Sequence, residues 1–187
     1  MLIQLIAQHP SAISSVLKGT PTWVWGLLAA LMALGISQVR TREVSLARTA
    51  VMPLVMSALS LLGTASAFGG SPLLAWVLVI WAAAAALMAR LVGTQPAPSG
   101  TRFDAGRRSF HVPGSVVPLM LITGLFMIKY IVGVDLAMQP SLARDGSYAL
   151  VIGALYGLFS GTFAGRTARL WRLARGPVAS PATAFTA

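Results

Sequence analysis

Residues 72–90 read PLLAWVLVIWAAAAALMAR, an apolar stretch that carries no charge before its final arginine. An α-helix rises about 1.5 Å per residue, so roughly 20 such residues cross the ~30 Å hydrocarbon core of a bilayer. Four further stretches have a similar length and character. We therefore predict an all-α membrane protein with five transmembrane helices. The predicted spans are residues 21–39, 49–68, 72–90, 115–135 and 148–166.

The overall composition is that of a membrane protein. Of the 187 residues, 56% are hydrophobic and 10% are charged, and the mean hydropathy is +0.78. A soluble domain of this size cannot bury so much apolar surface around one core. We expect a single membrane domain over residues 1–176 and a disordered tail over residues 177–187. The N-terminal sequence MLIQLIAQHP lacks the basic start of a signal peptide and is expected to be retained.

Basic residues outnumber acidic ones, with 14 Lys and Arg against 4 Asp and Glu and a net charge of +10. They flank the spans without the aromatic or Gly-rich context of an RNA-binding surface, so no nucleic acid is expected as a partner. Their concentration in alternate loops predicts a cytoplasmic C-terminus, an external N-terminus and contact with membrane lipids. Lys18 and Arg144 lie on the predicted outer side. The predicted cytoplasmic set is Arg40, Arg42, Arg48, Arg90, Arg102, Arg107, Arg108, Arg166, Arg169, Arg172 and Arg175.

Two parts of the sequence repeat one another. Residues 25–33 and 81–89 both contain Trp followed, at the same spacing, by Ala-Ala-Leu-Met-Ala. After a basic loop in each case, residues 51–54 and 116–119 share the pattern Val-x-Pro-Leu. The pattern predicts a tandem two-helix repeat of spans one and two with spans three and four, in parallel copies, and a fifth helix outside it. Coincidence in Ala- and Leu-rich sequence is the alternative.

The fifth span carries a stripe of small residues. Gly153, Gly157, Gly161 and Gly165 recur every four residues and so share one face of a helix. Lipid tails provide no hydrophobic drive for helices to associate, and small residues let two backbones approach closely instead. The stripe predicts helix packing, either against the other spans of this chain or at the seam of a homodimer.

Lys129 is a basic residue well inside a predicted span. An ammonium group near the bilayer centre costs about 3 kcal/mol unless it reaches the interface or finds a partner. Asp135 follows about 9 Å further along the helix, and Tyr130 is adjacent. Two interpretations stay open. Lys129 extends to the outer interface and is held by Asp135 or Asp145 beside Tyr130, or Lys129, Tyr130 and Asp135 form a ligand or proton site in an outward cavity.

A second candidate site lies in the long basic segment of residues 91–112, which we expect to be a mobile loop. Arg107, Arg108 and His111 precede Pro113 and could contact lipid headgroups or gather an anionic substrate. Neither a Gly-rich phosphate loop nor an acidic partner accompanies them in the sequence.

The sequence predicts no enzyme, no cofactor and no metal site. There is no cysteine, which excludes disulfides, thiolate catalysis and Cys-ligated metals. The two histidines, His9 and His111, are expected on opposite sides of the membrane, and the four acidic residues are divided between the two sides. None of the Ser-His-Asp, HExxH or GxSxG arrangements is present.

The sequence resembles a known family through several short motifs: TPTWVW at residues 20–25, MPL at 52–54, VPGS at 112–115 and KY at 129–130. The family comprises small multi-pass inner-membrane proteins of bacteria, classified as a domain of unknown function. The resemblance extends over residues 20–170. It implies a location in the bacterial inner membrane and supplies no activity.

From these features we expect a structural or partner-binding membrane subunit, acting in a homodimer or a larger membrane complex. The uniform spans, short loops and glycine stripe favour this role. The alternative is a transporter or exporter of a small molecule or ion, with its site near Lys129 and Asp135.

Overall fold

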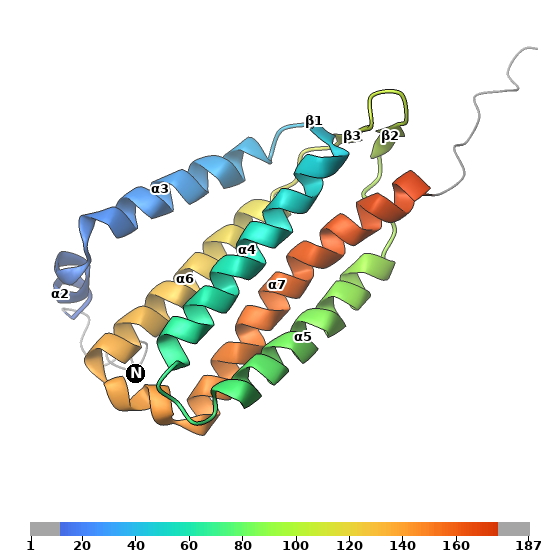
Figure 1. Cartoon of the computed structure of the whole chain (residues 1–187). Coiled ribbons are helices and arrows are strands. Elements are labelled where there is room, and N and C mark those ends of the chain that lie inside the picture. The colour runs from blue at the N-terminus through green and yellow to red at the C-terminus, as the bar shows by residue number, and fades with distance from the viewer. Residues whose placement is uncertain (1–11, 176–187) are drawn as a thin grey trace, which may run out of the picture.

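The computed structural model describes residues 12–175 and is a helical bundle with a small sheet at one end (Figure 1). The tail predicted over residues 177–187 lies outside the described residues, as does the segment 1–11. Within the described chain, four helices are long and apolar enough to cross a membrane, and they correspond to the second to fifth predicted spans. They are α4 (Leu46–Phe68), α5 (Leu74–Thr94), α6 (Val117–Met138) and α7 (Gly146–Arg175).

The first predicted span is a shorter helix. After α2 (Ala12–Gly19), the apolar helix α3 covers Thr22–Ser37, and its 16 residues rise about 24 Å against the ~30 Å of a bilayer core. Pro21 precedes its first turn, where the missing N–H is not needed. α3 packs mainly on α6 and lies at one edge of the molecule (Figure 1). The crossing of the membrane by α3 therefore stays a prediction.

Two long helices extend beyond their predicted spans because leaving an apolar environment does not end a helix. α5 continues to Thr94 and stops before Gln95, because Pro96 disfavours the helical conformation of the residue that precedes it. α7 continues through its basic turns to Arg175. Arg172 there donates hydrogen bonds to the carbonyl oxygens of Gly93 and Thr94, so the end of α7 caps the end of α5.

The segment of residues 91–112, predicted as a loop, instead contains two of the three strands of a sheet, and the prediction of a loop was wrong. The order of the strands is β1-β3-β2, and both pairings are antiparallel. β1 comes from the connection between α3 and α4, whereas β2 and β3 form a hairpin between α5 and α6. The strands are β1 (Arg42–Ser45), β2 (Arg102–Asp104) and β3 (Ser109–Val112).

One aromatic side chain forms the buried centre of this sheet. Phe110 is fully buried, lies opposite Val44 of β1, and its ring centroid is 4.9 Å from that of Phe103 on β2. The hairpin turn closes where Oδ1 of Asp104 accepts a hydrogen bond from the backbone N–H of Arg107 at 3.1 Å. Strands of three or four residues are too short for a periodic pattern, so only pairing between distant segments reveals them.

The core lies between α4, α5, α6 and α7. Its principal helix contacts join α5 to α7, α4 to α7 and, at the edge, α3 to α6. The predicted repeat would pair α3 with α4 and α5 with α6. Neither pair is among the principal helix contacts of the described residues. The repeat therefore stays a prediction. The large side chains of the core are Phe68, Tyr156, Phe163, Ile122, Ile152, Met56 and Leu125.

Candidate functional site

The glycine stripe of α7 faces α5 of the same chain. A Cβ atom added to Gly157 would meet the carbonyl oxygen of Trp81, and one added to Gly161 would meet that of Ala85. Added at Gly153 or Gly165, the atom would lie 2.8 or 2.7 Å from a valine side chain. The two backbones are thus in contact along the stripe. Of the two arrangements considered for these glycines, the structure places them within one chain.

A polar junction joins α7 to α4 on the other side. Pro53 lies inside α4 and has no N–H to donate to the carbonyl oxygen of Thr49, one turn earlier. That oxygen instead accepts a hydrogen bond from Oγ1 of Thr167 at 3.0 Å. Oγ1 of Thr49 accepts another from Nε1 of Trp171 at 2.9 Å. The proline therefore frees a backbone acceptor that α7 satisfies, as a low-dielectric environment requires.

Lys129 lies near the middle of α6 and turns inward. Its Nζ atom donates to the carbonyl oxygen of Leu59 on α4 at 3.5 Å and lies 4.3 Å from the centroid of the Tyr156 ring on α7. The contact with Asp135 or Asp145, which the first of the two interpretations requires, is not formed. About 18 Å of helix separates Lys129 from one end of α6 and about 14 Å from the other, so the ammonium group is far from both ends.

Tyr130 and Asp135 have partners of their own. The hydroxyl of Tyr130 lies 2.6 Å from Oγ1 of Thr20, which joins α6 to the α2–α3 connection. Asp135 is 4% exposed and accepts a hydrogen bond from the hydroxyl of Tyr148 on α7 at 3.5 Å. Successive residues of a helix are rotated by about 100°, so Lys129, Tyr130 and Asp135 point to three different sides. Lys129 and Tyr130 nonetheless line one cavity, whereas Asp135 does not line it, so two of the three predicted site residues are brought together.

A cavity of about 650 Å³ adjoins Lys129. It lies between α3, α4 and α6, with residues of α2 at one end, and its walls are almost entirely apolar. Lys129 is the charged residue among those that line it. We call it the Lys129 cavity. The side chains that define it include Val24, Leu27, Leu31, Leu59, Phe126 and Tyr130.

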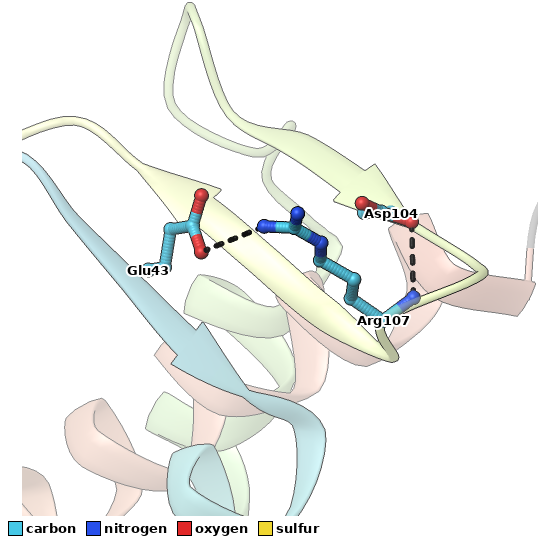
Figure 2. A network of polar contacts seen from close by, with 3 residues as sticks. All are labelled: Glu43, Asp104 and Arg107. Atoms are coloured by element: carbon cyan, nitrogen blue, oxygen red, sulfur yellow. Dashed lines mark hydrogen bonds and ion pairs between the residues drawn. The ribbon is translucent and has the colours of Figure 1, made fainter.

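The three basic residues proposed as an anion contact lie on the sheet and do not converge. Figure 2 shows the side chain of Arg107 extending across β3 toward β1, where its Nη1 atom is 4.0 Å from Glu43. Glu43 supplies the acidic partner that the sequence did not show. Both side chains are mostly exposed, so this ion pair contributes little to stability. Arg108 occupies the hairpin turn with a φ of 48°, and His111 is exposed on β3.

Over residues 12–175, no group of three or more His, Cys, Asp or Glu side chains is placed to hold a metal ion. His9 lies outside this range.

One comparison with known proteins identifies the chain. The sequence model of a family of unknown function, DUF6622, matches residues 1–182. The chain belongs to this family. No curated protein and no solved structure matches it. The resemblance to an uncharacterised family is confirmed, and membership of DUF6622 supplies no activity. The four apolar helices indicate that this member is a membrane protein.

Proposed function

We propose that this protein is a non-enzymatic subunit of the bacterial inner membrane that binds the transmembrane helix of a partner at the Lys129 cavity. The partner helix carries one acidic side chain at the depth of Lys129. The sheet lies on the cytoplasmic side, α3 crosses the membrane, and the N-terminus is external. The concentration of arginines at the sheet end supports this orientation.

The position of Lys129, a charged side chain in the middle of an apolar helix, is the observation that carries the proposal. Ionisable groups within membrane helices are costly, and they pair with one another or line a pathway. Among the described residues, Lys129 contacts a carbonyl oxygen and an aromatic ring, both uncharged. An acidic side chain from outside the chain would offset this half-buried charge, because opposite charges attract strongly where the dielectric constant is low.

The surroundings of Lys129 fit a helix rather than a soluble partner. α3 and α4 expose apolar side chains at the cavity, among them Trp23, Leu27 and Leu59. A membrane helix packs on such surfaces by close contact of side chains, and one polar pair between helices fixes its register. The cavity has room for several side chains but not for a whole helix.

A defined peptide tests this proposal. The protein, labelled with a fluorescent donor, is placed in phosphatidylcholine vesicles with an acceptor-labelled polyleucine helix that carries Glu at its centre. We expect energy transfer with the Glu peptide and at least about tenfold weaker association with a Gln peptide, because the Gln side chain offers no charge to Lys129.

Matched variants locate the effect. Lys129→Met keeps a long, unbranched side chain and removes the charge, so it should abolish the preference for the Glu peptide. Lys18→Met should retain the preference, because Lys18 lies in α2 away from the middle of the bundle. Equal association of the Glu and Gln peptides with the unaltered protein would contradict the proposal.

A transporter or exporter of a small anion is the second candidate, and the size of the cavity favours it. Pockets for small molecules typically enclose about 300–1,000 Å³ and have apolar walls with a few polar groups, and the Lys129 cavity of about 650 Å³ has this character. Reconstituted vesicles that release organic anions in a Lys129-dependent way would support it. The absence of flux together with helix binding would favour the subunit.

A further inference from the structure

A second cavity opens at the end of the bundle that carries the sheet. It has a volume of about 680 Å³ and lies between α3, β1, α4 and α7. Four arginines line it: Arg42 on β1, Arg48 in the first turn of α4, and Arg166 and Arg169 near the end of α7. We call this set the arginine cluster. Segments more than a hundred residues apart thus place four guanidinium groups around one space.

The described residues provide few acceptors and little negative charge to balance the arginine cluster. Arg42 donates to Oε1 of Gln38 at 2.8 Å. Nε of Arg169 is buried and has no hydrogen-bond partner among the described residues. Glu43 is the carboxylate among the lining residues, and it is mostly exposed and directed toward Arg107 on the sheet. Burial and the nearby positive charge of Arg48 lower the pKa of Arg42. The cluster therefore favours an anion.

Below the arginines the cavity becomes apolar. Its wall follows α4 through Val51, Val55 and Met56 and faces α3 at Leu31 and Leu34. The rise of α4 from its first residue to Met56 is about 15 Å, which equals half of the ~30 Å hydrocarbon thickness. The space thus runs from a charged mouth at the end of the helices to the middle of the bundle, the depth of one leaflet.

We propose that this second cavity binds one anionic phospholipid, with its phosphate in the arginine cluster and an acyl chain along α4. Guanidinium groups hold phosphate oxygens through paired, charge-assisted hydrogen bonds, and the fixed fork of Arg suits this geometry. The apolar wall selects a lipid over a soluble phosphate compound. The observations behind this inference are separate from those behind the partner helix, although the two cavities adjoin at Leu31, Met56 and Leu59.

Lipid-dependent stability tests the proposal. The protein purified in detergent is titrated with phosphatidylglycerol, with phosphatidylcholine or with inorganic phosphate, and the unfolding temperature and the lipid retained in native mass spectrometry are recorded. We expect phosphatidylglycerol to stabilise the protein most and one molecule to be retained. Arg166→Gln and Arg48→Gln should each weaken this binding about tenfold, because each removes a charged contact to the phosphate.

Two controls keep the result specific to the cluster. The control variants are Arg175→Gln and Arg40→Gln. Arg175 lies on the same helix as Arg166, and Arg40 lies near β1, but neither residue lines the cavity. Both should bind phosphatidylglycerol like the unaltered protein. If Arg166→Gln does not fold, the exposed Arg48 decides the test. Equal effects of the two lipids, equal losses in the control variants, or stabilisation by inorganic phosphate alone would overturn the proposal.

Discussion

At the scale of single residues, Thr49 shows how a helix interruption becomes a contact. Pro53 leaves the carbonyl oxygen of Thr49 without its partner in α4, and Thr167 of α7 donates to that oxygen. The side chain of Thr49 donates to the carbonyl oxygen of Leu46 and accepts from Trp171. Because Thr49 is buried, these groups have no access to water and depend on one another.

Thr49→Val should therefore destabilise the protein. The substitution keeps the shape of the side chain and leaves Nε1 of Trp171 without its acceptor. We expect the free energy of unfolding to fall by about 1–2 kcal/mol, measured by equilibrium unfolding in mixed micelles. Thr94→Val is the control, since Thr94 is exposed and bonds its own helix. A loss of the same size in both variants would contradict the role of the junction.

At the scale of helices and strands, α7 is the central element. It contacts α5 through the glycine stripe and α4 through the polar junction, and its end caps α5. Glycine is unfavourable in a helix by about 1 kcal/mol relative to alanine. Four glycines on one face are consistent with the close approach of α5, which leaves no space for a methyl group.

Two glycines test this packing. A methyl group at Gly157 would collide with backbone atoms of α5, so Gly157→Ala should lower the free energy of unfolding by about 1–3 kcal/mol. Gly133 on α6 has open space at the same position, so Gly133→Ala should leave stability unchanged or raise it by up to about 1 kcal/mol. Chemical unfolding of the two variants side by side gives the answer. Equal effects would show that helix propensity, and not packing, governs both sites.

A second prediction at this scale concerns the rate at which trypsin cleaves the β2–β3 hairpin. Paired strands resist proteases, and the hairpin contains three trypsin sites, at Arg102, Arg107 and Arg108. Phe110→Ala removes the buried ring that holds β3, so trypsin should cut the hairpin at least about tenfold faster, as followed by gel and mass spectrometry. His111→Ala, on the exposed face of the same strand, should be cut like the unaltered protein. Rapid cleavage of the unaltered hairpin would show that the sheet is not stable.

At the scale of the whole molecule, charge is distributed unevenly between the two ends of the bundle. β1, the β2–β3 hairpin, the first turn of α4 and the last turns of α5 and α7 carry the arginines of the sheet end. The opposite end carries Lys18 and Arg144. Such a bias orients a membrane protein during insertion, with the basic end in the cytoplasm.

Single cysteines can measure this orientation, because the chain has none of its own. In intact cells we expect an impermeant thiol reagent to label Gly19→Cys and Gly70→Cys, and to label Ala105→Cys only after the membrane is opened. Gly19 and Gly70 both have open space around them, so the substitutions should be tolerated. If Gly19→Cys behaves like Ala105→Cys, α3 does not cross the membrane and the N-terminus lies on the side of the sheet.

The candidate sites were predictable only where a single helix contains the signal. The sequence identified Lys129 as a charge within a span, because composition shows it directly. It grouped Lys129 with Asp135 by distance along the helix, whereas rotation about the helix axis sends the two side chains to different neighbours. The arginine cluster was missed because Arg42, Arg48 and Arg166 come from three elements. The spacing of Arg166 and Arg169, one helical turn apart, was the available hint.

The sequence by itself determined the membrane class, the positions of four long apolar helices, the uneven charge and the membership of the family. These properties follow from composition and from periodicity within one segment, which act over a few helical turns. The tertiary structure alone decided that α7 packs on α5, that β1 pairs with the distant strand β3, and that Lys129 turns toward α4 and α7. The physical reason is that each of these depends on which distant surfaces meet, and that choice is made by the packing of the whole chain.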